Sequence, residues 1–348
     1  MSIESYIQAM PKVDIGVSLQ GAVRKETWLL IAEQNEIAAS VKNFSKSLKR
    51  LENPDYTQLD PLLEMLGSWI KYPEDLTRLV YDMGVTFSKQ NIKYAEVLVN
   101  VANCVPAGWT FDKFITALSD GKDRVERGWG VRLNWILAVP RAEPRRADDT
   151  LRWVISANGR KNGVVAFGVI GPDDAQPAGQ FERTFSTAHK KEAKTVLQTG
   201  ISKGTAGVSE ALDILHPDRL LDAWGVIEDE ASLTKVVDNK TPISINLARA
   251  VYSGWIKDYG DYPLRQLMSS VEDISLNADL AQIYHVDLNQ MYLKAVQDCG
   301  LTIDELEMLA LNAIRNSFLS DEEKRTMLQE FKQTYAELRQ HHLQSSME

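Results

Sequence analysis

The hydrophobic positions of this chain fall into eight short runs rich in Val, Ile and Leu. The runs are "KVDIGVSL" (12–19), "YAEVLVNV" (94–101), "VRLNWILAVP" (131–140), "VVAFGVIG" (164–171), "KTVLQTGI" (194–201), "RLLDAWGV" (219–226), "TPISINLAR" (241–249) and "DISLNADL" (273–280). Several are apolar nearly throughout rather than alternating, a pattern typical of parallel strands buried on both faces. We predict a β-strand at each run.

Segments with helical periodicity separate these runs. Examples are "WTFDKFITALSDGKDRVERG", "ADDTLRWVISANGRK", "GTAGVSEALDIL" and "DYPLRQLMSSV". Strand and helix alternating eight times predicts an α/β fold, a (β/α)8 TIM barrel. A doubly wound open sheet is the alternative, but it usually carries a Gly-rich phosphate turn after its first strand. The stretch "SLQGAVRKE" contains no G-x-G-x-x-G motif.

Two regions exceed the strand–helix repeat. Residues 20–93, between the first and second strands, have a helical pattern and form a predicted insert. An insert at this place lies at the active-site end of a barrel, where it can cap the mouth. Residues 281–340 are again helical in pattern, and no low-complexity linker interrupts the chain. We therefore expect one barrel domain spanning 1–348.

Composition and charge narrow the range of partners. The formal net charge is −9, with 39 basic and 48 acidic residues, which argues against nucleic acid as a partner. No apolar run approaches the roughly 20 residues of a membrane helix, and the N-terminus "MSIESYIQAM" does not resemble a signal peptide. Two isolated cysteines, Cys104 and Cys299, fit a reducing compartment. A cytoplasmic protein is expected, with a small-molecule ligand and a protein partner or homo-oligomer both open.

Five stretches carry a resemblance to the adenosine deaminase family of the amidohydrolase superfamily. "PKVDIGVSLQGAVRKET" resembles the family's first strand, Pro-Lys-x-Glu-Leu-His-x-His-Leu-Asp-Gly-Ala/Ser, and "YAEVLVN" resembles Tyr-x-Glu-x-Arg at the second. "RLLDAWGVIEDEASL" resembles Arg-x-Gly-His-Gly-x-x-x-x-Glu-Asp at the sixth strand. "ISLNADLAQI" and "LNAIRNSFLSDEEKRTML" resemble the eighth strand and the C-terminal signature. The resemblance follows the family order over nearly the whole chain and implies the same barrel.

The resemblance also implies a chemistry, which is metal-assisted hydrolysis. In the family a zinc ion held by histidines and an aspartate activates a water that attacks the purine ring. The metal-ligand positions of the family fall here on Gly16, Ser18, Gln198 and Asp279. The sugar-contacting acid falls on Gln20, the proton-shuttle glutamate on Ile201, and the sixth-strand histidine on Asp222. Among the metal-ligand positions only Asp279 keeps the residue type of the family.

The histidine content supports the same interpretation without any alignment. The chain has five histidines: His189, His216, His285, His341 and His342. None lies at the C-terminal end of a predicted strand, and His341 and His342 fall in the C-terminal tail. Catalytic zinc usually has three protein ligands. We therefore predict no zinc and no other cofactor.

Other strand-end residues leave alternatives open. Asp222 and Asp279 could form a carboxylate pair for acid–base work or hold magnesium, or each could be satisfied by a local donor. Further strand-end candidates are Arg141, Asn246 and Arg249. Gly171 matches a family glycine whose backbone faces the purine, but it could equally close a tight turn. Trp224 could form a stacking wall or pack in the core, and Cys104 has no positioned histidine beside it.

The leading hypothesis is a barrel of the adenosine deaminase type that has lost the metal site and the proton shuttle and is non-catalytic. It would bind a nucleoside-like or small polar ligand through Gly16, Ser18, Gln20, Gly171, Gln198, Ile201, Asp222, Trp224 and Asp279. The alternative is a hydrolase or deaminase acting on a purine nucleoside or related heterocycle. That enzyme would work by a metal-free or magnesium-dependent route through Asp222 and Asp279.

Overall fold

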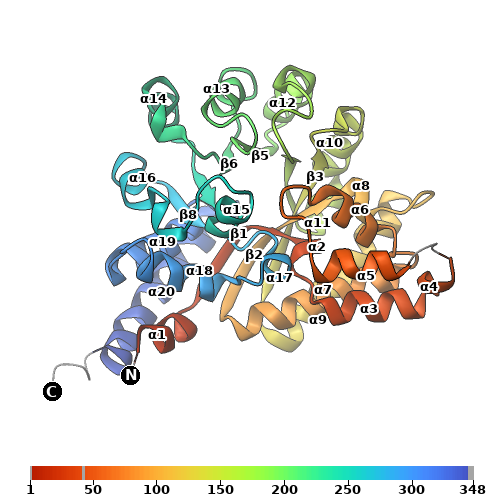
Figure 1. Ribbon diagram of the computed structural model, residues 1–348, viewed down its shortest axis with the longest axis horizontal. Coiled ribbons are helices and arrows are strands. Elements are labelled where there is room, and N and C mark those ends of the chain that lie inside the picture. Colours follow the sequence, from red (N-terminus) through yellow and green to blue (C-terminus); the bar gives the residue numbers. More distant parts are fainter. Residues whose placement is uncertain (1, 41–43, 344–348) are drawn as a thin grey trace.

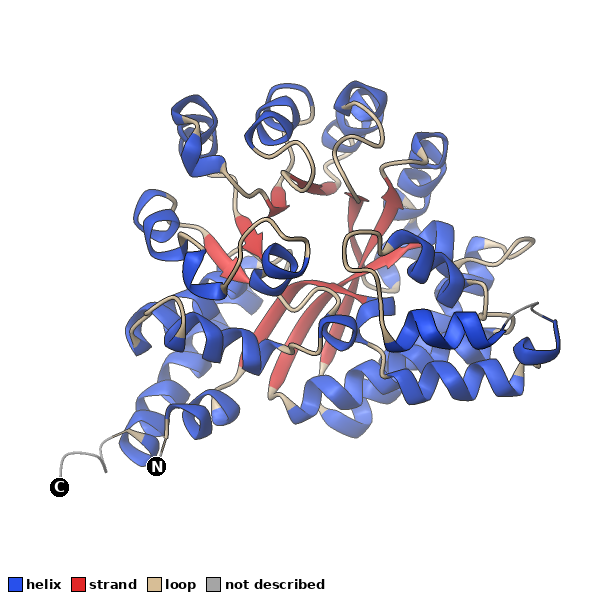
Figure 2. Ribbon diagram, in the orientation of Figure 1, coloured by secondary structure: helices blue, strands red, loops and turns tan. Residues whose placement is uncertain are grey.

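The strands form one parallel sheet that follows chain order and curves into a barrel (Figures 1 and 2). A computed structural model describes residues 2–40 and 44–343. The strands are β1 Lys12–Ser18, β2 Ile92–Asn100, β3 Arg132–Pro140, β4 Val164–Ile170, β5 Lys194–Thr199, β6 Arg219–Asp222, β7 Ile243–Ile245 and β8 Ile274–Leu276. Each strand pairs in parallel with the next one along the chain. The predicted (β/α)8 TIM barrel is confirmed.

The first and last strands meet through contacts beyond the regular ladder. The Ser18 amide donates to the Asp279 carbonyl at 3.0 Å, and the Ala278 amide donates to Oδ2 of Asp14 at 3.0 Å. Asp14 is fully buried, and its Oδ1 accepts from the Gly16 amide at 3.1 Å. The Asp14 side chain therefore joins β1 to the segment that follows β8.

The last three strands are shorter than the apolar runs that predicted them. Strand β7 ends before Asn246, whose side chain accepts a hydrogen bond from the Arg249 amide at 2.7 Å and so caps helix α15 (Leu247–Tyr252). Strands β6 and β8 end near Asp222 and Asp279, both of which have a positive φ, 66° and 41°. The left-handed conformation takes the chain out of the sheet.

Helices surround the barrel and cover its outer face (Figure 2). The N-terminal helix and those of the segment between β1 and β2 are α1 Ile3–Ala9, α2 Leu19–Ala22, α3 Lys25–Gln34, α4 Ile37–Ser40, α5 Phe44–Glu52, α6 Asp60–Gly67 and α7 Pro73–Lys89. Those between later strands are α8 Val101–Cys104, α9 Phe111–Trp129, α10 Ala147–Ile155, α11 Ala157–Lys161, α12 Glu182–Lys190, α13 Thr205–Ile214, α14 Glu230–Asp238, α15 and α16 Leu264–Ser270. Those after β8 are α17 Ala281–Tyr284, α18 Leu288–Gln297, α19 Ile303–Arg315 and α20 Asp321–His342. None of the described helices is long and apolar enough to span a membrane.

The segment between β1 and β2 is helical, as its pattern predicts, and part of it reaches the C-terminal end of the barrel. Helix α7 packs along α9 on the outside of the barrel. The loop 53–59 and the start of α6 line a cavity together with residues from the strand ends. The ring of Tyr56 packs against those of Tyr252 and Tyr284, with centroid distances of 4.4 Å and 6.1 Å. These ring contacts fasten the loop to α15 and α17.

A buried amine at the other end of β1 provides a pH-dependent test of the fold. Lys12 is fully buried, and its Nζ donates to the carbonyls of Ile7 (2.6 Å) and Met10 (2.5 Å). Burial lowers the pKa of Lys12 to about 7. Between pH 7 and the ordinary lysine pKa the unfolded chain therefore binds a proton that the folded chain does not. Stability from this group rises with pH across that window.

We expect Lys12→Met to remove this rise. Relative to the variant, the wild-type chain should gain roughly 1–2 kcal/mol of unfolding free energy between pH 7 and 9, since one pKa unit corresponds to about 1.4 kcal/mol. Urea denaturation at several pH values measures the difference. Lys190→Met, at an exposed lysine that does not act on Lys12, is the matched control and should keep the wild-type slope. Equal slopes in wild type and Lys12→Met would contradict the burial of a neutral amine.

Candidate functional site

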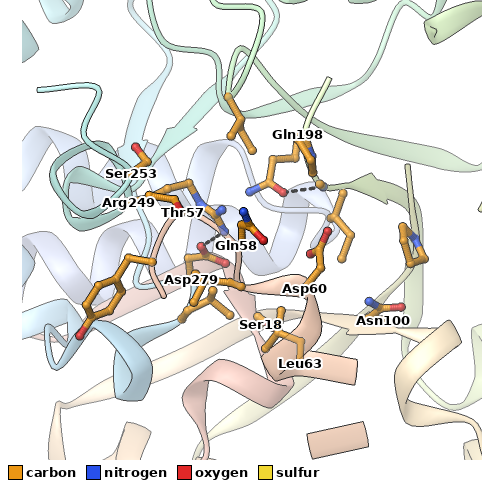
Figure 3. A pocket seen from close by; sticks show the side chains of 18 of the residues that line it. Ser18, Thr57, Gln58, Asp60, Leu63, Asn100, Gln198, Arg249, Ser253 and Asp279 are labelled. Carbon is orange, nitrogen blue, oxygen red and sulfur yellow. Dashed lines mark hydrogen bonds and ion pairs between the residues drawn. The ribbon is translucent and has the colours of Figure 1, made fainter. Parts of the chain in front are cut away.

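A cavity of about 320 Å³ lies at the C-terminal ends of the strands (Figure 3). This is the end of a (β/α)8 barrel at which active sites are built. Its lining residues are Ser18, Tyr56, Thr57, Gln58, Leu59, Asp60, Pro61, Leu63, Leu98, Asn100, Pro140, Ile170, Gly171, Pro172, Gln198, Ile201, Arg249, Ser253, Asp279, Leu280 and Tyr284. Apolar walls with a few polar groups are usual for small-molecule sites.

An arginine joins the two strand-end carboxylates at this cavity. Nη2 of Arg249 hydrogen-bonds to Oδ2 of Asp279, and its Nε lies 3.4 Å from Oδ2 of Asp222. The contact with Asp222 is an ion pair without an aligned hydrogen bond, since Nε of Arg249 and Oδ1 of Asp222 have no partner among the described residues. The cap at Asn246 starts α15 so that Arg249 reaches both carboxylates from its first turn. Asp222 and Asp279 are thus brought together, as their strand-end positions suggest, with a guanidinium between them.

Burial dominates the protonation of both carboxylates. It raises the pKa of Asp222 to about 7, and the Arg249 guanidinium offsets this only in part. Burial also raises the pKa of Asp279 against the opposing effect of Arg249. Both residues also have the left-handed backbone that is uncommon outside glycine, which is a form of strain found at functional positions.

A glutamine bridges the fourth, fifth and sixth strand ends. Oε1 of Gln198 accepts from the Gly171 amide at 2.9 Å, and its Nε2 donates to Oδ2 of Asp222 at 2.8 Å. The Gly171 amide is therefore occupied by a side chain of the protein. Gly171 has φ 103°, which a residue with a side chain rarely adopts, so the turn itself favours glycine.

Five of the nine residues predicted for the ligand site line the cavity. They are Ser18, Gly171, Gln198, Ile201 and Asp279. The other four lie behind the lining or beside it. Asp222 is buried behind Gln198 and Arg249, and Trp224 is buried with its ring stacked 5.0 Å from that of Trp255.

The remaining two residues belong to the first strand and its turn. Gly16 faces the side chain of Asn277, whose Cγ would lie 2.9 Å from an added Cβ. Any ligand-bearing side chain at Gly16 would therefore displace Asn277. Gln20 donates from Nε2 to the Leu63 carbonyl at 2.7 Å, and its Oε1 accepts from Nδ2 of Asn103 at 3.4 Å. Gln20 thus anchors helix α6, whose residue Leu63 lines the cavity.

Several lining residues had no signal in the sequence. The segment between β1 and β2 supplies Tyr56, Thr57, Gln58 and Asp60, and its path over the mouth depends on tertiary contacts. The sequence indicated Arg249 as a strand-end residue but assigned it no function. Asn246, three residues earlier, could have indicated its position, because Asn is a favourable N-cap and good helix formers follow it.

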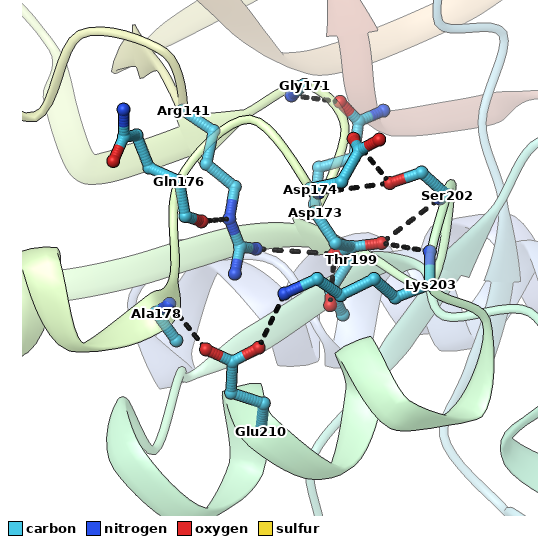
Figure 4. Close-up of polar contacts among 11 residues, drawn as sticks. Arg141, Gly171, Asp173, Asp174, Gln176, Ala178, Thr199, Ser202, Lys203 and Glu210 are labelled. Carbon is cyan, nitrogen blue, oxygen red and sulfur yellow. Dashed lines mark hydrogen bonds and ion pairs between the residues drawn. The ribbon is translucent and has the colours of Figure 1, made fainter.

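A second buried network holds two loops of the cavity wall (Figure 4). Nη1 of Arg141 lies 3.3 Å from Oδ1 of Asp173, and both side chains are fully buried. Asp173 also accepts from Oγ1 of Thr199 at 2.7 Å and from the Ser202 amide at 3.2 Å. The network therefore fastens the loops after β4 and β5 to each other and to the end of β3.

The donors at the strand ends do not fit a zinc ion. Over residues 2–40 and 44–343, no three or more His, Cys, Asp and Glu side chains come together so that they could hold a metal ion. Gly16 offers no ligand atom, the Gln198 amide is hydrogen-bonded at both ends, and Asp279 is paired with Arg249. Catalytic zinc usually requires three protein ligands that include imidazole, thiolate or carboxylate.

Comparison with known proteins establishes the family. The adenosine deaminase family model matches residues 11–334. The chain belongs to this family. The aminodeoxyfutalosine deaminase of Streptomyces avermitilis is 22% identical over 318 residues, which cover 91% of this chain and 89% of that protein.

Solved structures at low identity share the fold. An amidohydrolase from Burkholderia ambifaria with bound zinc has a TM-score of 0.87 at 18% identity, over 98% of this chain and 95% of that one. The Arabidopsis ADAL protein complexed with IMP has a TM-score of 0.86 at 19% identity, over 96% of this chain and 99% of that one. This member of the adenosine deaminase family thus shares its fold with a zinc-bound protein, although its own strand-end donors differ from a zinc site.

Proposed function

We propose that this chain is a member of the adenosine deaminase family that binds a nucleoside-like or small polar ligand at the barrel mouth and does not carry out zinc-dependent deamination. The proposal includes 1–348 as one barrel domain, 20–93 as its cap and 281–340 as its C-terminal helices. It also includes a cytoplasmic protein without a resident metal. A small-molecule ligand agrees with the nucleotide bound by the Arabidopsis relative.

One observation carries the proposal. The carboxylate of Asp279, which the resemblance aligns with a metal ligand of the family, is paired with the Arg249 guanidinium. A cation of the protein thus neutralises the group that would otherwise attract a metal ion. The cavity beside this pair is nevertheless formed and lined by polar residues from the strand ends and from the cap. A site that keeps its shape without the metal donors favours binding over metal-assisted hydrolysis.

A turnover assay tests the loss of deamination. The purified protein, with zinc added, is expected to release no ammonia from adenosine, adenine or aminodeoxyfutalosine, because the residues described at the strand ends do not offer the ligands that hold a water-activating ion. In parallel, thermal denaturation should show that purine nucleosides raise the Tm equally with and without a chelator. Ammonia release that depends on zinc and is abolished in Asp279→Ala would contradict the proposal.

The protonation of Asp222 supports a second candidate, a metal-free enzyme. Burial raises its pKa to about 7, where a carboxyl group can both donate and accept a proton. In this candidate Asp222 and Asp279 would carry acid–base chemistry on a purine nucleoside or related heterocycle. A turnover screen over nucleosides, bases and pterins separates the two. Activity that is lost in Asp222→Asn would favour the enzyme, while binding without turnover would favour the ligand-binding protein.

A further inference from the structure

Arg249 pairs with two carboxylates and still has one guanidinium nitrogen without a hydrogen-bond acceptor among the described residues. Its Nη2 bonds to Asp279 and its Nε faces Asp222, so two of its three nitrogens are directed at carboxylates. Within the described ranges 2–40 and 44–343, no carbonyl or side chain accepts a hydrogen bond from Nη1. Arg249 and Asp279 both line the cavity (Figure 3). One guanidinium nitrogen is therefore left for a ligand, directly beside a carboxylate acceptor.

The charge of the lining restricts what can bind next to this nitrogen. Of the described residues around the cavity, the charged ones are Arg249, Asp279 and Asp60, which amounts to one cation and two carboxylates. The guanidinium is already paired, so an added phosphate would meet no free cation and two acidic groups. A charge enclosed without a counter-ion is strongly disfavoured. The lining is therefore better matched by a ligand without net negative charge.

The pair also has a specific hydrogen-bonding pattern. A guanidinium nitrogen donates, and the neighbouring carboxylate accepts. The complementary ligand edge has a carbonyl oxygen next to an N–H, as in a lactam or a primary amide. The walls formed by Leu63, Leu98, Ile170 and Ile201 suit the flat apolar faces of such a ligand.

We propose that the guanidinium of Arg249 is the resident cation of this barrel mouth, in the role a metal ion would otherwise fill, and that the Arg249–Asp279 pair recognises an uncharged ligand through a lactam or amide edge. The inference rests on the proposed ligand-binding function and names its ligand class. It departs from metal-dependent relatives in one testable respect. The positive charge at the mouth is covalently part of the chain and cannot be removed by a chelator.

Two Arg249 variants separate the parts of this inference. Arg249→Lys keeps the charge but replaces the planar fork with a point charge. We expect it to fold normally and to bind inosine, a nucleoside with a lactam edge, about tenfold more weakly than the wild type, as for one lost hydrogen bond from a charged donor. Arg249→Ala removes the charge and leaves Asp222 and Asp279 facing each other. Carboxylates completed by water suit hard divalent ions, so Mn²⁺ should raise the Tm of this variant.

The experiment compares wild type, Arg249→Lys and Arg249→Ala by thermal denaturation and calorimetric titration. The probes are Mn²⁺, inosine, adenosine and inosine 5′-monophosphate. The inference predicts that Mn²⁺ stabilises only Arg249→Ala, and that wild type binds inosine more tightly than adenosine or the monophosphate. A variant that folds only in the presence of Mn²⁺ would support it equally. If Mn²⁺ stabilised the wild type as much as Arg249→Ala, the proposal that Arg249 is the resident cation would be overturned.

A separate result would contradict the binding of a lactam or amide edge by the Arg249–Asp279 pair. Equal affinity of wild type and Arg249→Lys for inosine, or tighter binding of the monophosphate, would overturn it. If none of the probes stabilised the wild type, the proposed ligand-binding function would fail. The Mn²⁺ comparison would still decide the role of Arg249, because it needs no organic ligand.

Discussion

Replacing Arg219 with methionine is expected to lower the free energy of unfolding by about 3–5 kcal/mol, since one member of a buried ion pair is lost. Arg219 and Glu96 have no exposed side-chain surface, and Nη1 of Arg219 lies 2.7 Å from Oε2 of Glu96. No hydrogen bond is aligned along that contact, but Nη1 donates to the Ile15 carbonyl at 2.9 Å. The Phe318 ring centroid lies 4.1 Å from Cζ of Arg219. The pair joins three strands and the segment after α19, so the variant leaves a buried carboxylate without its partner.

Urea denaturation measures this loss, and two variants serve as controls. The double variant Glu96→Gln/Arg219→Met removes both charges and should recover a large part of the stability, because no uncompensated ion remains. Arg152→Met, in an exposed ion pair with Asp149, should change stability by less than about 1 kcal/mol. A small effect of Arg219→Met, or a double variant no more stable than the single one, would show that the pair does not hold the barrel together.

Asp173→Ala should have an effect of similar size and also weaken ligand binding. The variant leaves the fully buried guanidinium of Arg141 without its counter-ion, which is expected to cost about 3–5 kcal/mol. It also removes the acceptor for Oγ1 of Thr199 and for the Ser202 amide. Because Gly171 and Ile201 on the two released loops line the cavity, affinity for a nucleoside should fall along with the Tm.

The neighbouring Asp174 provides the matched control for this prediction. Its side chain is exposed and accepts from Oγ of Ser202 at 2.9 Å. Asp174→Ala should leave both stability and affinity close to those of the wild type. Thr199→Val removes one hydrogen bond and should cost roughly 1 kcal/mol. Asp173→Ala with wild-type affinity would mean that the network supports the fold but not the cavity.

The barrel architecture could be predicted because it follows from local patterns of hydrophobic residues along the chain. Eight β-rich apolar runs with helical segments between them are sufficient for the barrel, and the strands begin close to where those runs begin. The ends of the later strands could not be predicted from hydrophobicity. The run 241–249 continues apolar through Leu247 and Ala248, and the cap at Asn246 converts this stretch into α15. The chain also leaves the sheet at Asp222 and Asp279 through left-handed backbone conformations that no apolar pattern encodes.

The sequence could predict where the candidate site lies in the barrel, but it could not predict the contacts between its side chains. The strand ends placed Ser18, Gln198 and Asp279 at one mouth, because parallel strands of a barrel end on the same side. The ion pairs of Arg249 with Asp222 and Asp279 join helix α15 to the end of β6 and to the segment after β8, and only the closed barrel brings these together. The hydrogen bond from the Gly171 amide to Oε1 of Gln198 has the same origin. Contacts of this kind depend on the register and curvature of the sheet, which the sequence pattern does not contain.

We infer that the cation at this barrel mouth is Arg249 and not a metal ion. Zinc content per chain, measured by mass spectrometry on protein purified without chelators and dialysed after exposure to zinc, tests it most directly. We predict a zinc content well below one ion per chain, because the strand ends lack the three ligands that a zinc site usually requires. One zinc ion per chain, lost in Asp279→Ala, would contradict the account.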